Sequence, residues 1–346
     1  MTFAETRPAR TPGRRVLDAL RLLVRALGYF CGALLMAWAS LAINFSTLPW
    51  PWLRLVLAIS FAAFGVWALW ITRRPRMPWV FAGLFIVVCV WWATILPSHD
   101  RDWRTEVAVM PRAIIAGDRV RFAGVRNFDF RSRDDFTARY EEREVSLSHL
   151  TGVDFYVAFW AEGPIGHTFL SFIFDNAPPL AISIETRPEV GEGFDPLASM
   201  FKQFELIYVV GEERDLVRLR TNFRDEEVFL YHLNISPDAA RRLFLVYVER
   251  INELHDHPEW YHLLSNSCTI NIVRYANVAG RIGEWDIRHL LNGWIDRYFY
   301  NVGLVDNSLG FDELRRRSNI TAVSRAAGNG EDFSERIREN LPPAHP

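Results

Sequence analysis

The sequence predicts an α+β protein with three N-terminal transmembrane helices, followed by a domain of antiparallel sheet and helices. Long apolar stretches fill residues 26–97, short strand-like stretches occupy residues 118–234, and helical periodicity begins at Ser236. The 346 residues are enough for two domains. The formal net charge of −2 argues against a nucleic-acid partner.

Each of the three apolar stretches is long enough to cross a bilayer. Residues 26–53, 55–72 and 77–98 contain no charged residue, and about 18 apolar residues suffice to span the hydrocarbon core. Arginines precede the first stretch and fill the turn at 73–76, whereas the turn "NFSTLPWPW" has no basic residue. The positive-inside rule therefore predicts a cytoplasmic N-terminal tail, residues 1–25, three spans within residues 26–97, and an outer domain after them.

Strand patterns begin the outer domain, which we place at residues 98–315. They are short runs rich in β-branched and aromatic residues, separated by Gly, Pro and polar residues. They occupy residues 118–130, 153–160, 167–174, 180–186, 206–210, 215–220 and 228–234. The runs 206–210 and 215–220 flank "GEER", which predicts a hairpin.

Helices follow the strands. Ser236-Pro237-Asp238 combines a capping hydroxyl, a proline for the first helical position and an acid for the positive dipole end. A second helix is expected to start at a cap formed by Asn266 or Ser267 and to end at Gly280. More helix is expected over residues 284–300. Residues 316–346 are polar, and we expect a disordered tail there.

Cys268 is the only cysteine of the outer domain, because Cys31 and Cys89 lie within the spans, where a thiol packs as a small apolar group. It falls in the first turn of the second predicted helix. Unpaired N–H groups and the helix dipole favour a thiolate there, and the same N–H groups can hold an oxyanion. The alternative interpretation is a buried structural thiol.

His167, in "GPIGHTFLSF", is the candidate base for that thiol, because it opens a strand beside a turn. The next strand, "AISIETR", offers Ser183 and Glu185 as residues that orient the imidazole. Glu185 is the better electrostatic partner, although the sequence leaves the choice open. The plainer alternatives are a surface histidine and a surface ion pair between Glu185 and Arg187.

A second cluster, "HDHPEWYH", contains His255, His257 and His262 and suggests a metal site. However, Pro258 interrupts the helix, and the spacing matches no strong zinc signature. We therefore expect no metal and no cofactor.

The order of these residues resembles that of the circularly permuted papain-like thiol enzymes: a histidine opening a strand, a polar residue on the next strand, and a later cysteine starting a helix. A closer resemblance covers roughly residues 98–280. Several segments, in order, look like the Lnb-type N-terminal periplasmic domain family: "SHDRDW", "VRNFDFRS", "GHTFLSFIF", "ISIETRPEVGEGFDPL", "FELIYVVGEERDLVRLRTNFR" and "YHLLSNSCT".

The resemblance implies a lipoprotein N-acyltransferase with a permuted papain-like fold, in which the catalytic roles fall on Cys268 and His167. We expect Glu185 to orient His167. It implies a bacterial inner-membrane protein with a periplasmic domain. The implied partners are the membrane, a lipid acyl donor (a phospholipid or a diacylglyceryl group) and a lipoprotein acceptor. Two other functions remain open: a periplasmic cysteine amidase or peptidase, and a non-catalytic membrane scaffold.

Overall fold

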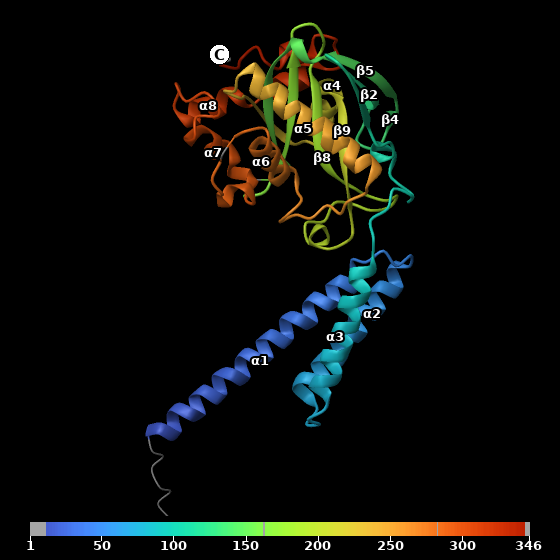
Figure 1. Ribbon diagram of the computed structural model, residues 1–346, viewed down its shortest axis with the longest axis vertical. Helices are drawn as coiled ribbons and strands as arrows, with labels where there is room; N and C mark the ends of the chain where they lie inside the picture. Colours follow the sequence, from blue (N-terminus) through green and yellow to red (C-terminus); the bar gives the residue numbers. More distant parts are fainter. Residues whose placement is uncertain (1–11, 162, 282, 343–346) are drawn as a thin grey trace, which may run out of the picture. The chain divides into compact units, whose positions relative to one another are not determined.

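The computed structural model describes residues 12–161, 163–281 and 283–342, and these form two compact units (Figure 1). One unit contains the chain up to Leu96 together with Phe201–Gln203, and the other contains the remainder from Pro97 onward.

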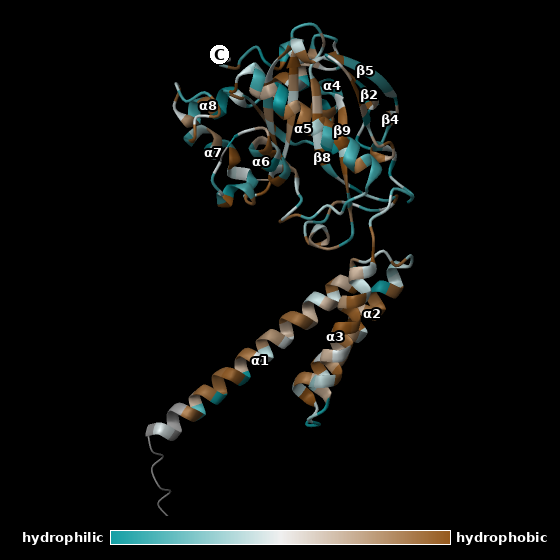
Figure 2. Cartoon of the chain, in the orientation of Figure 1, coloured by the Kyte–Doolittle hydropathy of each residue, from teal (hydrophilic) through white to brown (hydrophobic). Residues whose placement is uncertain are grey.

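The first unit consists of three apolar helices, coloured largely brown in Figure 2. Their candidate membrane spans cover Leu17–Asn44, Pro51–Ile71 and Met77–Thr94, which confirms three membrane-length helices. The helices are α1 (Pro12–Asn44), α2 (Pro51–Val66, continued by the π-helix η1, Trp67–Ile71) and α3 (Met77–Thr94).

Within the predicted tail of residues 1–25, residues 12–25 already belong to α1, while residues 1–11 lie outside the described residues. The apolar run therefore does not mark where the helix begins. Lys202, the only lysine of the sequence, belongs to this unit and donates to the carbonyl oxygens of Trp92 (2.9 Å) and Ile95 (2.8 Å). The Trp92 carbonyl also accepts from the N–H of Ile95, so Lys202 adds a second donor to a carbonyl at the end of α3.

The second unit is built on an eight-stranded sheet in the described part of the chain, in the order β1-β2-β9-β8-β7-β6-β10, with β5 also paired to β2. Neighbouring strands are antiparallel except β2 and β9. Two short strands, β3 and β4, pair separately. The strands are β1 (Arg112–Ala116), β2 (Arg119–Arg126), β3 (Asp129–Phe130), β4 (Phe136–Thr137), β5 (Tyr140–Ser146), β6 (Leu150–Phe159), β7 (His167–Phe174), β8 (Leu180–Arg187), β9 (Glu205–Glu212) and β10 (Glu227–His232).

Helices cover both faces of this sheet, so its central strands are buried on both sides. On one face Phe172 of β7 contacts Phe244 and Tyr247 of α5, the long helix that crosses the sheet in Figure 1. Phe169, three residues earlier, faces the other side and packs with Val217 of α4. The helices of the second unit are α4 (Glu213–Arg218, continued by the π-helix η5, Leu219–Phe223), α5 (Pro237–Asp256), α6 (Cys268–Val278), α7 (Ile295–Asn301), α8 (Phe311–Ser318), α9 (Thr321–Ala327) and α10 (Phe333–Arg336).

The predicted start of α5 is confirmed, because the Ser236 hydroxyl accepts a hydrogen bond from the N–H of Ala239. The predicted hairpin strand at 215–220 is wrong, since these residues form α4 and η5. The reason is tertiary: Asp215 is buried and accepts from Arg126 Nε (3.0 Å), Arg126 Nη2 (2.7 Å) and the N–H of Phe128 (2.8 Å). Residues 284–300 are only partly helical, with two 3₁₀ turns, η6 (Ile287–His289) and η7 (Asn292–Trp294), before α7.

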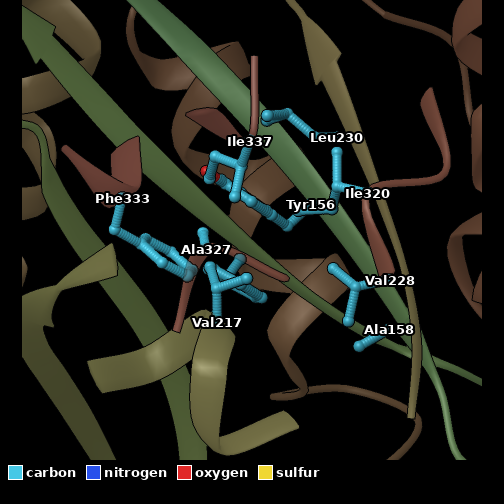
Figure 3. Packing of buried hydrophobic residues seen from close by; sticks show 10 residues of the cluster. Tyr156, Ala158, Val217, Val228, Leu230, Ile320, Ala327, Phe333 and Ile337 are labelled. Carbon is cyan, nitrogen blue, oxygen red and sulfur yellow. The ribbon is translucent and has the colours of Figure 1, made fainter. Parts of the chain in front are cut away.

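The prediction of a disordered tail after residue 315 is wrong for residues 316–342. Ile320, Ala327, Phe333 and Ile337 lie buried against the sheet residue Tyr156 (Figure 3). Arg338 also reaches inward and donates to Asp154 Oδ2 (2.7 Å) and Glu213 Oε2 (2.8 Å). Residues 343–346 lie outside the described residues. The C-terminal segment is therefore part of the core.

Candidate active site

Cys268 is the first residue of α6, and only 3% of its surface is exposed. Ser267 precedes it in an extended conformation, its hydroxyl makes no capping hydrogen bond, and Gly280 follows the helix with φ +104°. The thiol therefore lies at the positive end of the helix dipole, as predicted. Its sulfur is 3.8 Å from Thr269 Oγ1 and 3.9 Å from Asn292 Nδ2.

Asn292, the first residue of η7, fixes the start of α6 against the start of β7. Its Oδ1 accepts from the N–H of Gly166 (2.8 Å), and its Nδ2 donates to the Gly166 carbonyl (2.8 Å) and to Thr269 Oγ1 (2.9 Å). Thr168 of β7 adds a hydroxyl contact to Thr269 (2.8 Å). Cys268 consequently lies close to Gly166, the residue that precedes His167.

His167 opens β7 as predicted, and its Nε2 lies 2.7 Å from Ser183 Oγ on β8. The Ser183 hydroxyl donates to Glu185 Oε1 at 2.8 Å, whereas Glu185 Oε1 is 3.7 Å from the imidazole. Ser183 is thus the direct partner of His167, and Glu185 acts through it. A hydroxyl has one proton, and Glu185 receives it, so Nε2 of His167 is the donor and Nδ1 of the neutral ring is left as the basic nitrogen.

Burial and two arginines set the charges of this group. Glu185 accepts from Arg220 Nη2 at 2.8 Å. Burial alone would raise the pKa of Glu185, but Arg220, His167 and Arg224 outweigh it and hold that pKa below its ordinary value. Burial, followed by the charge of Arg220, lowers the pKa of His167 to about 3. The imidazole is therefore neutral at pH 7, the form in which a histidine accepts a proton.

The structure brings His167 and Cys268 to the same end of β7, but it does not place them in contact. Successive residues of a strand point to opposite faces. Thr168 faces Thr269 of α6, whereas His167 stacks with Phe169 on the face covered by α4. Among the described residues Cys268 has no hydrogen bond to His167. Direct proton transfer between them requires a change of side-chain conformation at the start of β7.

Two residues that the sequence analysis missed contact the thiol region, Asn292 and Tyr261. Burial and the neighbouring Cys268 raise the pKa of Tyr261 well above its usual value, so its hydroxyl keeps its proton beside the thiol. Tyr261 is the first letter of "YHLLSNSCT", so the motif contained the signal. Nothing in the sequence around Asn292 marks it.

Other residues considered from the sequence have different surroundings. Arg187 does not pair with Glu185, because it is buried, stacks over Trp103 (4.2 Å) and donates to the carbonyls of Val107 (2.9 Å) and Ala108 (2.7 Å). His255 contacts Asp256, and the Nδ1 of His262 contacts Ser265. In the described ranges no three His, Cys, Asp or Glu side chains are grouped as a metal site.

Comparison with known families gives one match. Residues 136–293, which include all the site residues described above, match the family model described as the Lnb N-terminal periplasmic domain. No curated protein and no solved structure matches the chain. Together with the three membrane-length helices, the match fits a membrane protein with a periplasmic domain. Residues 136–293 therefore belong to the Lnb N-terminal periplasmic domain family, as the sequence predicted.

Proposed function

We propose that this protein is a membrane-anchored thiol acyltransferase that acts at the outer face of the bacterial inner membrane. The observation that carries the proposal is the position of Cys268: the lone thiol of the outer domain starts α6, inside the family match. We assign the acceptor as the N-terminal amine of a lipoprotein and the donor as a phospholipid or a diacylglyceryl group. We assign the N-terminus to the cytoplasm, following the arginines that precede the apolar stretch of residues 26–53.

In the proposed first half-reaction, the thiol proton moves to Nδ1 of His167 and the thiolate attacks the ester carbonyl of the lipid. The first N–H groups of α6 hold the oxyanion. The ester C–O bond breaks, the leaving alkoxide takes the proton from His167, and the acyl chain remains on Cys268 as a thioester. The acceptor amine then attacks the thioester, loses a proton to His167, and releases the thiolate, which is reprotonated.

The low pKa of His167 determines the charge of the imidazole in the resting site. With that pKa at about 3, the resting imidazole is neutral and does not form an ion pair with Cys268. We propose that substrate binding rotates His167 toward Cys268 and that the transfer occurs only in the closed geometry. His167 then reaches the thiol proton only when the substrate is bound.

The separation of His167 and Cys268 favours a second candidate, a non-catalytic membrane scaffold. In that case the His167–Ser183–Glu185–Arg220 chain is a structural polar network, and the thiol is a packed core group.

The test is product formation by the full-length protein reconstituted in phospholipid vesicles with a diacylglyceryl lipopeptide. We expect an N-acylated lipopeptide with the wild type, none with Cys268→Ala, and unchanged product with Cys89→Ala, a matched thiol removal in α3. Cleavage of a peptidoglycan fragment by the wild type instead would identify an amidase. A Cys268→Ala protein as active as the wild type would exclude both enzymes.

A further inference from the structure

A cavity of about 150 Å³ lies in the second unit, between α5, α6 and the chain around α7. Its walls are mainly aliphatic and aromatic, and they include Leu170, Leu243, Ile272, Val273, Ala276 and Phe299. The charged residues Arg242 and Arg281 also line it, and Nε of Arg242 donates a hydrogen bond to the Ala279 carbonyl (2.9 Å). A cavity of similar size lined by Leu, Ile and Phe stays dry and accepts apolar ligands. Its chemistry therefore selects a hydrocarbon.

Two elements connect this cavity to the candidate nucleophile. On α6, Ile272 and Ala276 follow Cys268 by four and eight residues, which places this part of the lining about 6 and 12 Å from the thiol along the helix. On β7, Leu170 is two residues beyond Thr168 and points to the same face. Thr168 contacts Thr269, the neighbour of Cys268. The same helix and the same strand thus run from the thiol region to the cavity.

We propose that the cavity holds the acyl chain that the enzyme transfers. This inference rests on the proposed function and adds the binding site for the hydrocarbon part of the substrate. The first carbons of the chain bridge the gap between Cys268 and Ile272, and the distal carbons lie along Ile272, Val273 and Ala276. The part of the lining that lies on α6, from Ile272 to Ala276, extends over about 6 Å of helix. The apolar lining therefore matches part of a membrane-lipid chain in polarity.

The test uses full-length protein in vesicles that contain a phospholipid with a diazirine near the methyl end of one acyl chain. Cys268→Ala is used, so that binding is measured without transfer. After photolysis, mass spectrometry maps the crosslinked residues. We expect crosslinks on α6, around Ile272–Ala276, in addition to crosslinks in α1–α3 that serve as an internal positive control. Crosslinks confined to α1–α3 would overturn the proposal.

A pair of substitutions on one helix sharpens the test. Ala276→Phe fills the cavity, whereas Val278→Phe adds the same ring at a position of α6 that is 61% exposed. Losing the burial of roughly two methylene groups of the lipid chain weakens binding about tenfold. We therefore expect Ala276→Phe to reduce the α6 crosslinks about tenfold. Val278→Phe should leave them unchanged. Ala276→Leu, a smaller filling, replaces Ala276→Phe if circular dichroism shows that the larger side chain disrupts the fold.

The possible results distinguish a failure of the cavity proposal from a failure of the proposed function. Crosslinks on α6 without any lipopeptide product from the wild type would support the cavity and contradict the proposed function. Product formation that Ala276→Phe and Ala276→Leu leave intact, with no crosslinks on α6, would support the function and overturn the cavity proposal.

Discussion

At the scale of single residues, Ser183 determines which nitrogen of His167 carries the proton. Its one proton goes to Glu185, so it accepts from Nε2 and leaves Nδ1 basic. Ser183 touches neither the thiol nor the substrate in the proposed mechanism, and it is a positioning residue. The sequence alone favoured Glu185 as the direct partner, because a carboxylate is the stronger electrostatic partner and the register of the two strands was unknown.

We predict that Ser183→Ala slows acylation of Cys268 about tenfold. This loss is smaller than the 10²–10⁴-fold by which a general base typically raises a reaction rate, because the base itself remains. The reason is that His167 then populates the tautomer with a protonated Nδ1. The measurement is the rate of acyl-enzyme formation against pH, because loss of the serine alters the charge interaction between His167 and Glu185 and thus the profile. Ser183→Thr should restore both rate and profile. Equal rates for Ser183→Ala and the wild type would show that the serine does not position the base.

The pKa of His167 also predicts how stability depends on pH. The folded state holds that pKa at about 3, below the ordinary 6.5, so between these values the unfolded chain binds more protons than the folded one. The contribution of His167 is therefore fully present above pH 6.5 and is lost as the pH falls from 6.5 to about 3. We expect a loss of roughly 2–4 kcal/mol across this window.

The matched variant His167→Gln isolates this effect in denaturant unfolding of the detergent-solubilised protein. Glu205 changes stability in the opposite direction, because burial raises its pKa to about 7 despite Arg101, and its contribution weakens as the pH rises from 4.5 to 7. Glu205 is present in both proteins, so it cancels in the difference. A wild type and variant that lose stability in parallel between pH 6.5 and 3 would contradict the low pKa of His167.

At the scale of elements, Asn292 links η7, the turn before β7 and the first turn of α6. We predict that Asn292→Ala costs about 2 kcal/mol, because the N–H and carbonyl of Gly166 and the Thr269 hydroxyl lose a buried partner. Acyl-enzyme formation should fall as well, since the thiol is no longer fixed beside β7. Asn301→Ala, at an exposed position at the end of α7, is the control and should change neither quantity. An Asn292→Ala protein with wild-type stability would mean that the three elements are held by packing alone.

The C-terminal helices are the element whose role was least visible in the sequence. Arg338 is 17% exposed and bonds Asp154 and Glu213, which are 2% and 0% exposed. Removing one partner of a buried ion pair typically costs about 3–5 kcal/mol, so we predict a loss of this size for Arg338→Met. The Arg316 side chain is 70% exposed, so Arg316→Met should cost less than about 1 kcal/mol. Chemical denaturation of both variants measures the difference, and a small loss for Arg338→Met would contradict a structural role for the segment that follows α10.

Particular elements explain what the sequence could predict. The strand 167–174 and the start of α5 were predictable because their signals are local: a β-branched and aromatic run, and a Ser-Pro-Asp cap. The helix at 213–218 was missed because the partners of its buried Asp215, Arg126 and the N–H of Phe128, are far away in the sequence. The ordered C-terminal segment was missed because its buried residues, Ile320, Ala327, Phe333 and Ile337, are spread over short helices with no complete amphipathic repeat.

The residues of the candidate site also differ in whether the sequence could predict them. Cys268 and His167 were found because their residue types carry chemistry in any context. Asn292 and the role of Ser183 depend on which strands and turns lie side by side, and the sequence does not state this.

At the scale of the whole molecule, three membrane-length helices and a family-matched outer domain belong to one chain. This connection keeps the thiol and the lipid in the same compartment, provided that the outer domain is periplasmic. In the proposed reaction the membrane supplies the acyl donor directly, and the local lipid concentration replaces diffusion from solution.

The most direct test of the central claim is the intact mass of the full-length wild type after incubation with a phospholipid of defined acyl chains. We predict that the mass of the wild type increases by one acyl group and that this group maps to Cys268. Neutral hydroxylamine should remove it, and Cys268→Ala should not acquire it. Cys89→Ala should acquire the adduct as the wild type does. A wild type that stays unmodified with every lipid offered, or an adduct that persists in Cys268→Ala, would contradict a thioester acyltransferase centred on this residue.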